Sequence, residues 1–220
     1  MSIFYISREY SNESKRQTIK ELLEATTPDR DFYLLVIGSI ILALCGILSD
    51  NITVLIASMI VAPLMFPILS LSLALVVSDN RLFVQSLIML IFSVILAILI
   101  GGVFSLLVKS YFVIGERVLI SFFPNIFFDV LIAVVSGIIA TYGLIRPKVG
   151  AAMTGIGIGV SLMPPLVALG IGLFDPITDL ATRAGTIFLL NFFGILTGSI
   201  ITFIMFNMRH EYHVVKNNLK

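Results

Sequence analysis

Long stretches without a charged residue, separated by short charged segments, form the main pattern of the chain. A helix that crosses a bilayer needs roughly 17 to 25 residues, and five of the stretches reach that length by themselves. The fourth reaches it when residues 125–128 are included at its start. The pattern predicts an all-α polytopic membrane protein with six transmembrane helices. The uncharged stretches are 32–49, 51–78, 82–108, 130–145, 149–174 and 184–208.

Prolines interrupt the second and the fifth stretch. Pro63 and Pro67 lie inside the second, and Pro164 and Pro165 lie inside the fifth. A proline within a membrane helix removes one backbone N–H and leaves one carbonyl without its partner. Paired interruptions in the two halves of a chain are typical of broken helices that form a solute or ion site near the bilayer midplane. The alternative is a pair of kinks whose carbonyls are satisfied by neighbouring helices.

The first three stretches and the last three resemble each other. Because each half has three predicted helices, the second half enters the membrane from the opposite side, which gives an inverted-topology repeat with broken second and fifth helices. The alternative is that two unrelated groups of hydrophobic helices look alike. The corresponding residues are Asp31 and Asp129, Gly38 and Gly137, Pro63 and Pro164, and Arg81 and Arg183.

The repeat divides the chain into five parts. Residues 31–108 form the first three-helix repeat and 129–208 the second. The connection 109–128 is rich in aromatic residues, which settle at membrane interfaces, so we expect an interfacial linker there. Residues 1–30 and 209–220 are predicted to be cytoplasmic tails.

A short amphipathic helix is predicted over residues 12–26 of the N-terminal tail. Ile19 and Leu22 follow at helical spacing, with basic residues elsewhere on the helix. We expect this helix to lie on the inner membrane face and to bind anionic lipid headgroups. Its thin apolar stripe also fits a plain solvated helix. The predicted headgroup contacts are Lys15, Arg16 and Lys20.

The distribution of lysine and arginine predicts the orientation, because cytoplasmic loops carry an excess of these residues. With the N-terminus in the cytoplasm, only Lys109, Arg117 and Arg183 fall on the opposite side. The protein is then expected to lie in the inner membrane with both termini in the cytoplasm. The residues on the cytoplasmic side are Arg8, Lys15, Arg16, Lys20, Arg30, Arg81, Arg146, Lys148, Arg209, Lys216 and Lys220.

Composition excludes several classes of protein. With 58% hydrophobic and 12% charged residues, the chain is too apolar for a soluble domain of this size. A net charge of +1 gives no indication of nucleic-acid binding, and the single Cys45 excludes a disulfide framework. No ionisable residue lies in the middle of a predicted span, which argues against a proton relay of side chains.

Catalytic and metal-binding patterns are missing from the sequence. His210 and His213 are three positions apart in a polar tail, whereas the zincin motif needs two histidines four apart on a helix. The glycine-rich run 155–159 lies within a predicted span, without the strand-to-helix unit of a nucleotide site. We therefore expect no enzyme, no cofactor and no metal site.

The candidate pathway follows the two proline interruptions. Carbonyls released there are suited to cations, and the N-terminal ends of the half-helices to anions; the sequence leaves both open. Small residues before the second break allow close approach of backbones, for helix packing or for a pore wall. The candidate residues are Ser58, Met59, Pro63, Pro67, Gly155, Gly159, Val160, Ser161, Pro164, Pro165 and Asn191.

Four segments together resemble one known family: 51–67, 78–81, 146–148 and 160–166. The chain from about residue 31 to residue 206 is similar to the domain of unknown function 389 family, integral membrane proteins of bacteria and archaea. The resemblance implies the membrane class and the repeat, and leaves the chemistry open. Many members carry a larger soluble domain before the spans, where this chain has the short basic helix.

These patterns favour a small membrane transporter or channel with its pathway at the proline interruptions. The alternative is a non-transporting membrane scaffold or lipid-binding protein. A membrane enzyme is a third hypothesis, for which no nucleophile, base or metal cluster is assembled by spacing. A chain of this size is expected to form a homo-oligomer, because such assemblies usually close by symmetry.

Overall fold

The computed structural model describes residues 12–27, 29–108, 125–146, 162–174 and 179–218, and within these residues it contains nine helices and no strand. The all-helical prediction is therefore confirmed for this part of the chain. The helices are α2 (Asn12–Glu24), α3 (Arg30–Leu48), α4 (Ile52–Val61), α5 (Met65–Val77), α6 (Asn80–Val108), α8 (Ile126–Ile145), α10 (Met163–Phe174), α11 (Leu180–Met205) and α12 (Met208–Asn218).

Four of the described helices, α3, α6, α8 and α11, are long and apolar enough to cross a membrane. A fifth span is counted if α4 and α5, which bend by 49° at a short break, are taken as one. The predicted count of six is not confirmed, because only the second part of the fifth stretch, the short helix α10, lies within the described residues.

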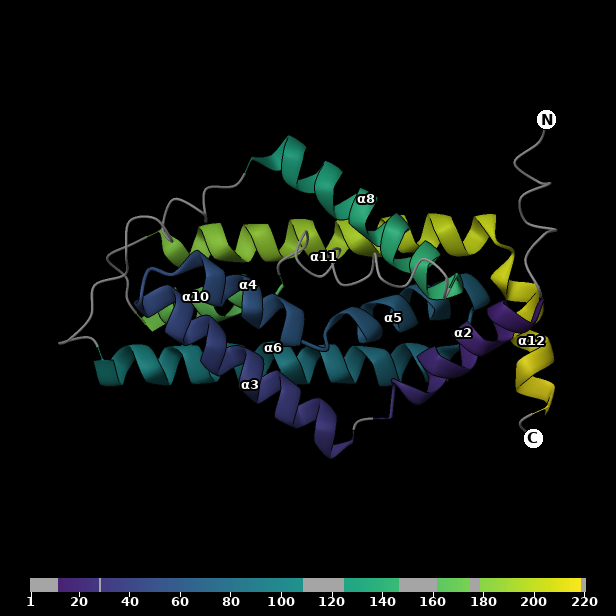
Figure 1. The fold of residues 1–220 in the computed structure, drawn as a ribbon, viewed down its shortest axis with the longest axis horizontal. Helices are drawn as coiled ribbons and strands as arrows, with labels where there is room; N and C mark the ends of the chain where they lie inside the picture. Colours follow the sequence, from purple (N-terminus) through teal and green to yellow (C-terminus); the bar gives the residue numbers. More distant parts are fainter. Residues whose placement is uncertain (1–11, 28, 109–124, 147–161, 175–178, 219–220) are drawn as a thin grey trace.

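Two long helices, α6 and α11, organise the molecule, and the short helices α5 and α10 lie between them (Figure 1). Each short helix packs against both long ones. On the outside, α8 runs along α11, and α3 packs against α4 and α10. The main core forms where these helices meet, around buried residues such as Ile40, Ile68, Met163 and Leu166.

Glycines allow the closest helix contacts. A Cβ atom on Gly137 of α8 or on Gly198 of α11 would collide with the backbone of the other helix. On α10, a Cβ atom on Gly170 would lie 2.5 Å from the carbonyl oxygen of Ile98 on α6. These pairs therefore meet backbone against backbone, a kind of packing that membrane helices use because lipid supplies no hydrophobic driving force.

The outer faces of the long helices are apolar. Leu34 of α3, Ile88 of α6, Ile132 of α8 and Phe193 of α11 are each about half exposed or more. A soluble protein rarely leaves such extended apolar surface open to water, whereas a bilayer requires it. The exposed faces and the helix lengths together indicate a membrane protein.

Helices α2 and α12 pack together at one end of the bundle (Figure 1). The predicted amphipathic helix exists as α2, but its apolar stripe faces the protein: Ile19 and Leu22 are fully buried in a second core. This core includes Leu69 of α5, Leu144 of α8 and Tyr212 of α12. Burial against other helices therefore replaces the burial in lipid that the sequence suggested.

The C-terminal region also differs from the sequence pattern. The predicted sixth span continues to residue 208, but α11 ends at Met205 and the chain turns at Asn207, which has a φ of 53°. The predicted polar tail then forms the helix α12. Its buried residues Met208, Tyr212 and Val215 follow at helical spacing, a signal that was present in the sequence.

Candidate functional site

The first break separates α4 from α5. The last hydrogen bond of α4 runs from the Ala62 N–H to the Ser58 carbonyl at 3.1 Å. Pro63 has no N–H with which to continue the ladder, and α5 begins two residues later. Pro67 lies in the first turn of α5, a place that tolerates proline because the N–H groups there lack intrahelical partners. The prolines therefore end one helix and start the next.

Helix α10 begins in the same way. Its start reads Leu162-Met163-Pro164-Pro165, and the start of α5 reads Leu64-Met65-Phe66-Pro67. In each, the leucine directly before the helix accepts a hydrogen bond at 3.4 Å, from the Leu166 N–H and the Ile68 N–H respectively. The helix starts thus align Pro67 with Pro165, whereas the sequence pattern aligned Pro63 with Pro164.

The two short helices run toward opposite ends of the bundle. The end of α5 lies beside the end of α11, where Leu75 and Phe203 line one hollow. The end of α10 lies beside the start of α11, because a Cβ atom on Gly172 would collide with Ala181. Both helices begin near the middle of the long axis (Figure 1). Their positively polarised N-termini are therefore inside the bundle.

The residues at these starts are mostly buried. Pro67, Pro164 and Pro165 are buried, and Met59 and Pro63 are partly buried. No side chain caps the N-terminus of α5, so a polar partner for its first N–H groups has to come from elsewhere.

Two polar candidates also lie within the described helices. Ser58 of α4 is buried and donates its hydroxyl to the Leu55 carbonyl of its own helix at 2.7 Å. Asn191 is buried on α11. The structure thus describes the first break on both sides and, of the predicted second break, only the start of α10. Four further candidates, Gly155, Gly159, Val160 and Ser161, lie outside the described residues.

A cluster of hydrogen-bonded polar side chains at the end of the bundle was not predicted from the sequence. Asp79 precedes α6 and accepts hydrogen bonds from the Leu82 N–H at 2.9 Å, the Tyr212 hydroxyl at 2.9 Å and the Lys216 ammonium. It therefore caps α6 and also fastens α12. A partner 137 residues away has no signal in a single sequence.

The cluster continues to α2 through Glu211. This buried carboxylate accepts a hydrogen bond from Arg16 Nε at 2.9 Å and lies 3.4 Å from His210 Nδ1. Burial raises the pKa of Glu211, but the hydrogen bonds and charges of Arg16 and His210 outweigh burial and lower it. The carboxylate therefore stays charged and holds α2 against α12.

Burial and hydrogen bonding also oppose each other at Asp79. Burial raises the pKa of its carboxyl group, but the hydrogen bonds from Lys216, Leu82 and Tyr212 outweigh it and lower the pKa to about 2. Burial, and then the hydrogen bond to Asp79, raise the pKa of the Tyr212 hydroxyl. At neutral pH Asp79 is therefore a charged carboxylate, and it accepts a hydrogen bond from the protonated hydroxyl of Tyr212.

The three predicted headgroup contacts have different surroundings. Lys15 is buried, Arg16 is bound to Glu211, and Lys20 is exposed. For metals, no group of three or more histidine, cysteine or acidic residues among the described residues has the placement to hold an ion.

Comparisons with known proteins place the chain in a family. The model of a family described as a domain of unknown function (DUF389) matches residues 59–197. Uncharacterized protein MJ0678 of Methanocaldococcus jannaschii is 28% identical over 207 residues, which are 90% of this chain and 62% of that protein. The chain thus spans less than two thirds of this curated relative. No solved structure matches. Because the family model covers more than half of the chain, the protein belongs to the domain of unknown function 389 family.

Proposed function

We propose that the protein is a membrane transporter or channel for a small solute or ion. The pathway lies where α5 and α10 begin. One observation carries the proposal: two half-helices start with the same Leu-Met-x-Pro sequence inside the bundle and run toward opposite ends. Half-helices whose ends point at a common interior region are the usual construction of substrate and ion sites in transporters.

The packing is consistent with the proposed inverted repeat. A two-fold rotation that exchanges α5 with α10 also has to exchange α6 with α11. Each short helix packs against the long helix of its own half and against that of the other half, as this rotation requires. We therefore propose six spans, of which residues 31–108 and 129–208 supply three each, with 109–128 as linker.

The starts of α5 and α10 supply polar groups that a solute needs in an apolar interior. Backbone N–H groups without side-chain caps at α5 favour an anion or a carbonyl oxygen of the solute. The Met59 carbonyl, next to the break, favours a cation. Gly155, Gly159, Val160 and Ser161 are proposed to complete the second half of the pathway, with Asn191 beside it.

We also propose an orientation: the end that holds α2 and α12 lies on the cytoplasmic side of the inner membrane, so that both tails are cytoplasmic. The protein is proposed to work as a homo-oligomer in contact with membrane lipids, without catalytic activity, resident cofactor or nucleic-acid partner.

A non-transporting scaffold or lipid-binding protein is the second candidate. It is favoured by the burial of Met163, Leu166 and Val167 at the start of α10, each with no exposed surface. An interior filled by apolar side chains leaves little room for water. This candidate predicts insertion without flux.

Flux through purified protein separates the two candidates. We would measure current in planar bilayers under a KCl gradient, and uptake of small uncharged solutes by proteoliposomes. Pro67→Ala and Pro165→Ala each restore a backbone N–H and remove the ring that clashes with the carbonyl four residues earlier, so that α5 and α10 can extend backward at their N-terminal ends. We expect each variant to insert normally and to change flux severalfold, and the reversal potential of the wild type to identify the favoured ion charge.

The matched control is Leu99→Ala on the exposed face of α6, where Leu99 is 52% exposed. This variant should leave flux unchanged. Absence of both current and solute uptake, with insertion verified by protease protection, would contradict the transport proposal and support the scaffold. Flux that is identical in all variants would reduce the prolines to structural kinks.

A further inference from the structure

A hollow of about 490 Å³ opens on the side of the bundle, near the end that holds α12. This volume lies within the range of small-molecule sites, about 300–1,000 Å³. Three helices form it: the end of α5, the end of α11 and the start of α12. The lining residues are Leu75, Val76, Ser78, Ile200, Phe203, Ile204, Asn207, Met208 and Arg209.

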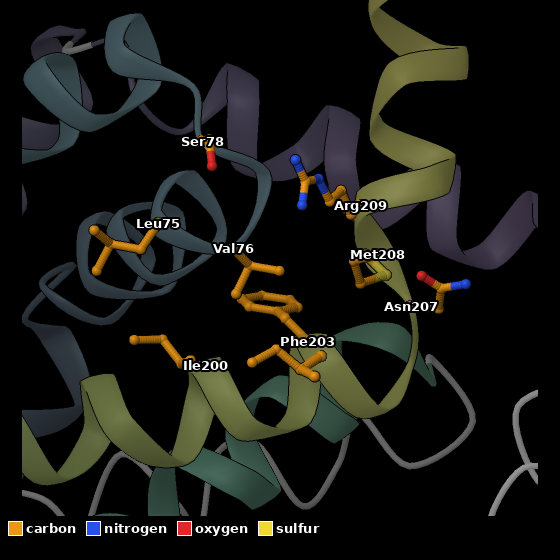
Figure 2. A pocket seen from close by; sticks show the side chains of 9 residues that line it. Leu75, Val76, Ser78, Ile200, Phe203, Asn207, Met208 and Arg209 are labelled. Carbon is orange, nitrogen blue, oxygen red and sulfur yellow. The ribbon is translucent and has the colours of Figure 1, made fainter.

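Apolar side chains form most of the walls of this groove. Leu75 of α5 is 46% exposed and Ile204 of α11 is 61% exposed, so both are accessible from the apolar outer surface of the bundle. Val76 forms the inner surface and packs against the second core, which contains the fully buried Phe203 (Figure 2). A hydrocarbon chain that enters from the bilayer loses no hydrogen bonds and gains contacts on several sides.

The polar residues of the groove lie at one end only. Ser78 and Asn207 mark the ends of α5 and α11, with φ angles of 57° and 53°. Figure 2 shows the guanidinium of Arg209 reaching over the hollow toward Ser78. Arg209 is also where the last uncharged stretch of the sequence ends. The groove is therefore apolar along the membrane and polar at the level of the headgroups.

Arg209 is available to a ligand. It is exposed, and no other described residue forms an ion pair or side-chain hydrogen bond with it. Two neighbouring cations differ, since Arg16 is bound to Glu211 and Lys216 to Asp79. A guanidinium at the membrane surface without a carboxylate attracts phosphate, which it binds with two parallel hydrogen bonds.

We propose that this groove binds an anionic phospholipid, with one acyl chain against Leu75, Val76 and Ile204 and the headgroup phosphate on Arg209. The distribution of polarity in the groove matches that of the lipid from end to end. The site is separate from the helix breaks, and the proposal does not depend on transport. It also differs from the α2 surface, where Lys15 is buried and Arg16 is already paired.

The chain contains no tryptophan, so a single introduced tryptophan reports on one place. We would prepare the full-length Leu75→Trp variant in vesicles and measure quenching by brominated phosphatidylglycerol and by brominated phosphatidylcholine of the same chain length. One basic residue at a membrane surface contributes a preference for anionic lipid of about fivefold. We expect this preference at Leu75→Trp, and a ratio near one after Arg209→Gln is added.

Two controls separate the groove from the general lipid surface. Leu99→Trp, on the exposed face of α6, should show a ratio near one. Adding Lys20→Gln, which removes an exposed charge from α2, should leave the preference at Leu75→Trp intact. Ile204→Trp on the opposite wall serves as a second reporter if Leu75→Trp does not fold. A ratio near one at both reporters, or a preference that persists in Arg209→Gln, would overturn the proposal.

Discussion

At the scale of single residues, Asp79 joins two helices, although its place in the sequence indicates only the start of α6. It caps the first turn of α6 through the Leu82 N–H and accepts from Tyr212 and Lys216 of α12. A buried carboxylate is costly unless its oxygens are hydrogen-bonded. The partners on α12 therefore stabilise the charge, and the charge in turn fixes α12.

Replacement of Tyr212 by phenylalanine tests this arrangement. The variant removes one hydrogen bond to a charged acceptor, while Lys216 and the Leu82 N–H still satisfy Asp79. We expect the free energy of unfolding to fall by about 1–2 kcal/mol, measured by denaturation in mixed detergent micelles.

The matched control for this measurement is Tyr33→Phe. Tyr33 packs edge-to-face with Phe92, and its hydroxyl forms no hydrogen bond with a described residue. Its replacement should change the free energy of unfolding by less than about 0.5 kcal/mol. Equal effects of the two substitutions would show that the bond between Tyr212 and Asp79 does not stabilise the fold.

At the scale of helices, the contact of α8 with α11 depends on the absence of side chains. Gly137 faces the backbone of Ile195, and Gly198 faces the backbone of Val134. Ser199 adds a hydrogen bond from its hydroxyl to the Gly137 carbonyl at 3.4 Å. A methyl group at either glycine has no space unless the helices move apart.

Two glycine-to-alanine substitutions are therefore expected to have opposite signs. Gly137→Ala should lower the free energy of unfolding by about 1–3 kcal/mol through overpacking. Gly38, its counterpart in the sequence repeat, has no heavy atom within 4 Å of the position of a Cβ atom. Gly38→Ala should therefore be neutral or stabilising by up to about 1 kcal/mol, because alanine loses less backbone freedom in a helix.

Thermal unfolding of both variants in the same detergent gives the comparison. A loss of stability in Gly38→Ala as large as that in Gly137→Ala would show that α3 is packed as tightly as α8. In that case the two halves would be more alike than the described contacts indicate.

At the scale of the whole molecule, the end cluster joins α2, α6 and α12 through Asp79 and Glu211. Both carboxyl groups have pKa values below their ordinary values, and that of Asp79 falls from 3.8 to about 2. A lowered pKa in the folded state contributes stability above the ordinary pKa, and this contribution is lost as the pH falls through the folded value. The cluster should therefore be intact at neutral pH and fail in acid.

Acid is expected to loosen α12 before the rest of the bundle. Between pH 5 and pH 2, hydrogen exchange of α12 amides, corrected for intrinsic rates, should accelerate by on the order of tenfold relative to α8 and α11. The Asp79→Asn variant should show a smaller change, because only Glu211 then titrates within the cluster. Protection of α12 that is constant over this pH range would contradict the role of the cluster.

Much of the architecture was predictable from the sequence, because lipid imposes strict demands on composition. A helix in hydrocarbon must satisfy its own backbone and exclude charges over its whole length, so the uncharged stretches mark α3, α6, α8 and α11 to within a few residues. Prolines have equally local effects, and the break between α4 and α5 lies at Pro63 as predicted.

The tertiary structure decided which partner each face meets. The apolar stripe of α2 fits lipid and protein equally well in the sequence, and only the presence of α5, α8 and α12 buries Ile19 and Leu22. Gly38 and Gly137 have corresponding sequence positions, but only the second faces a backbone. Asp79 and Lys216 are 137 residues apart. Composition and periodicity indicate whether a segment suits lipid or water and which residues lie near each other along one helix. Contacts between distant segments depend instead on how all the helices pack together.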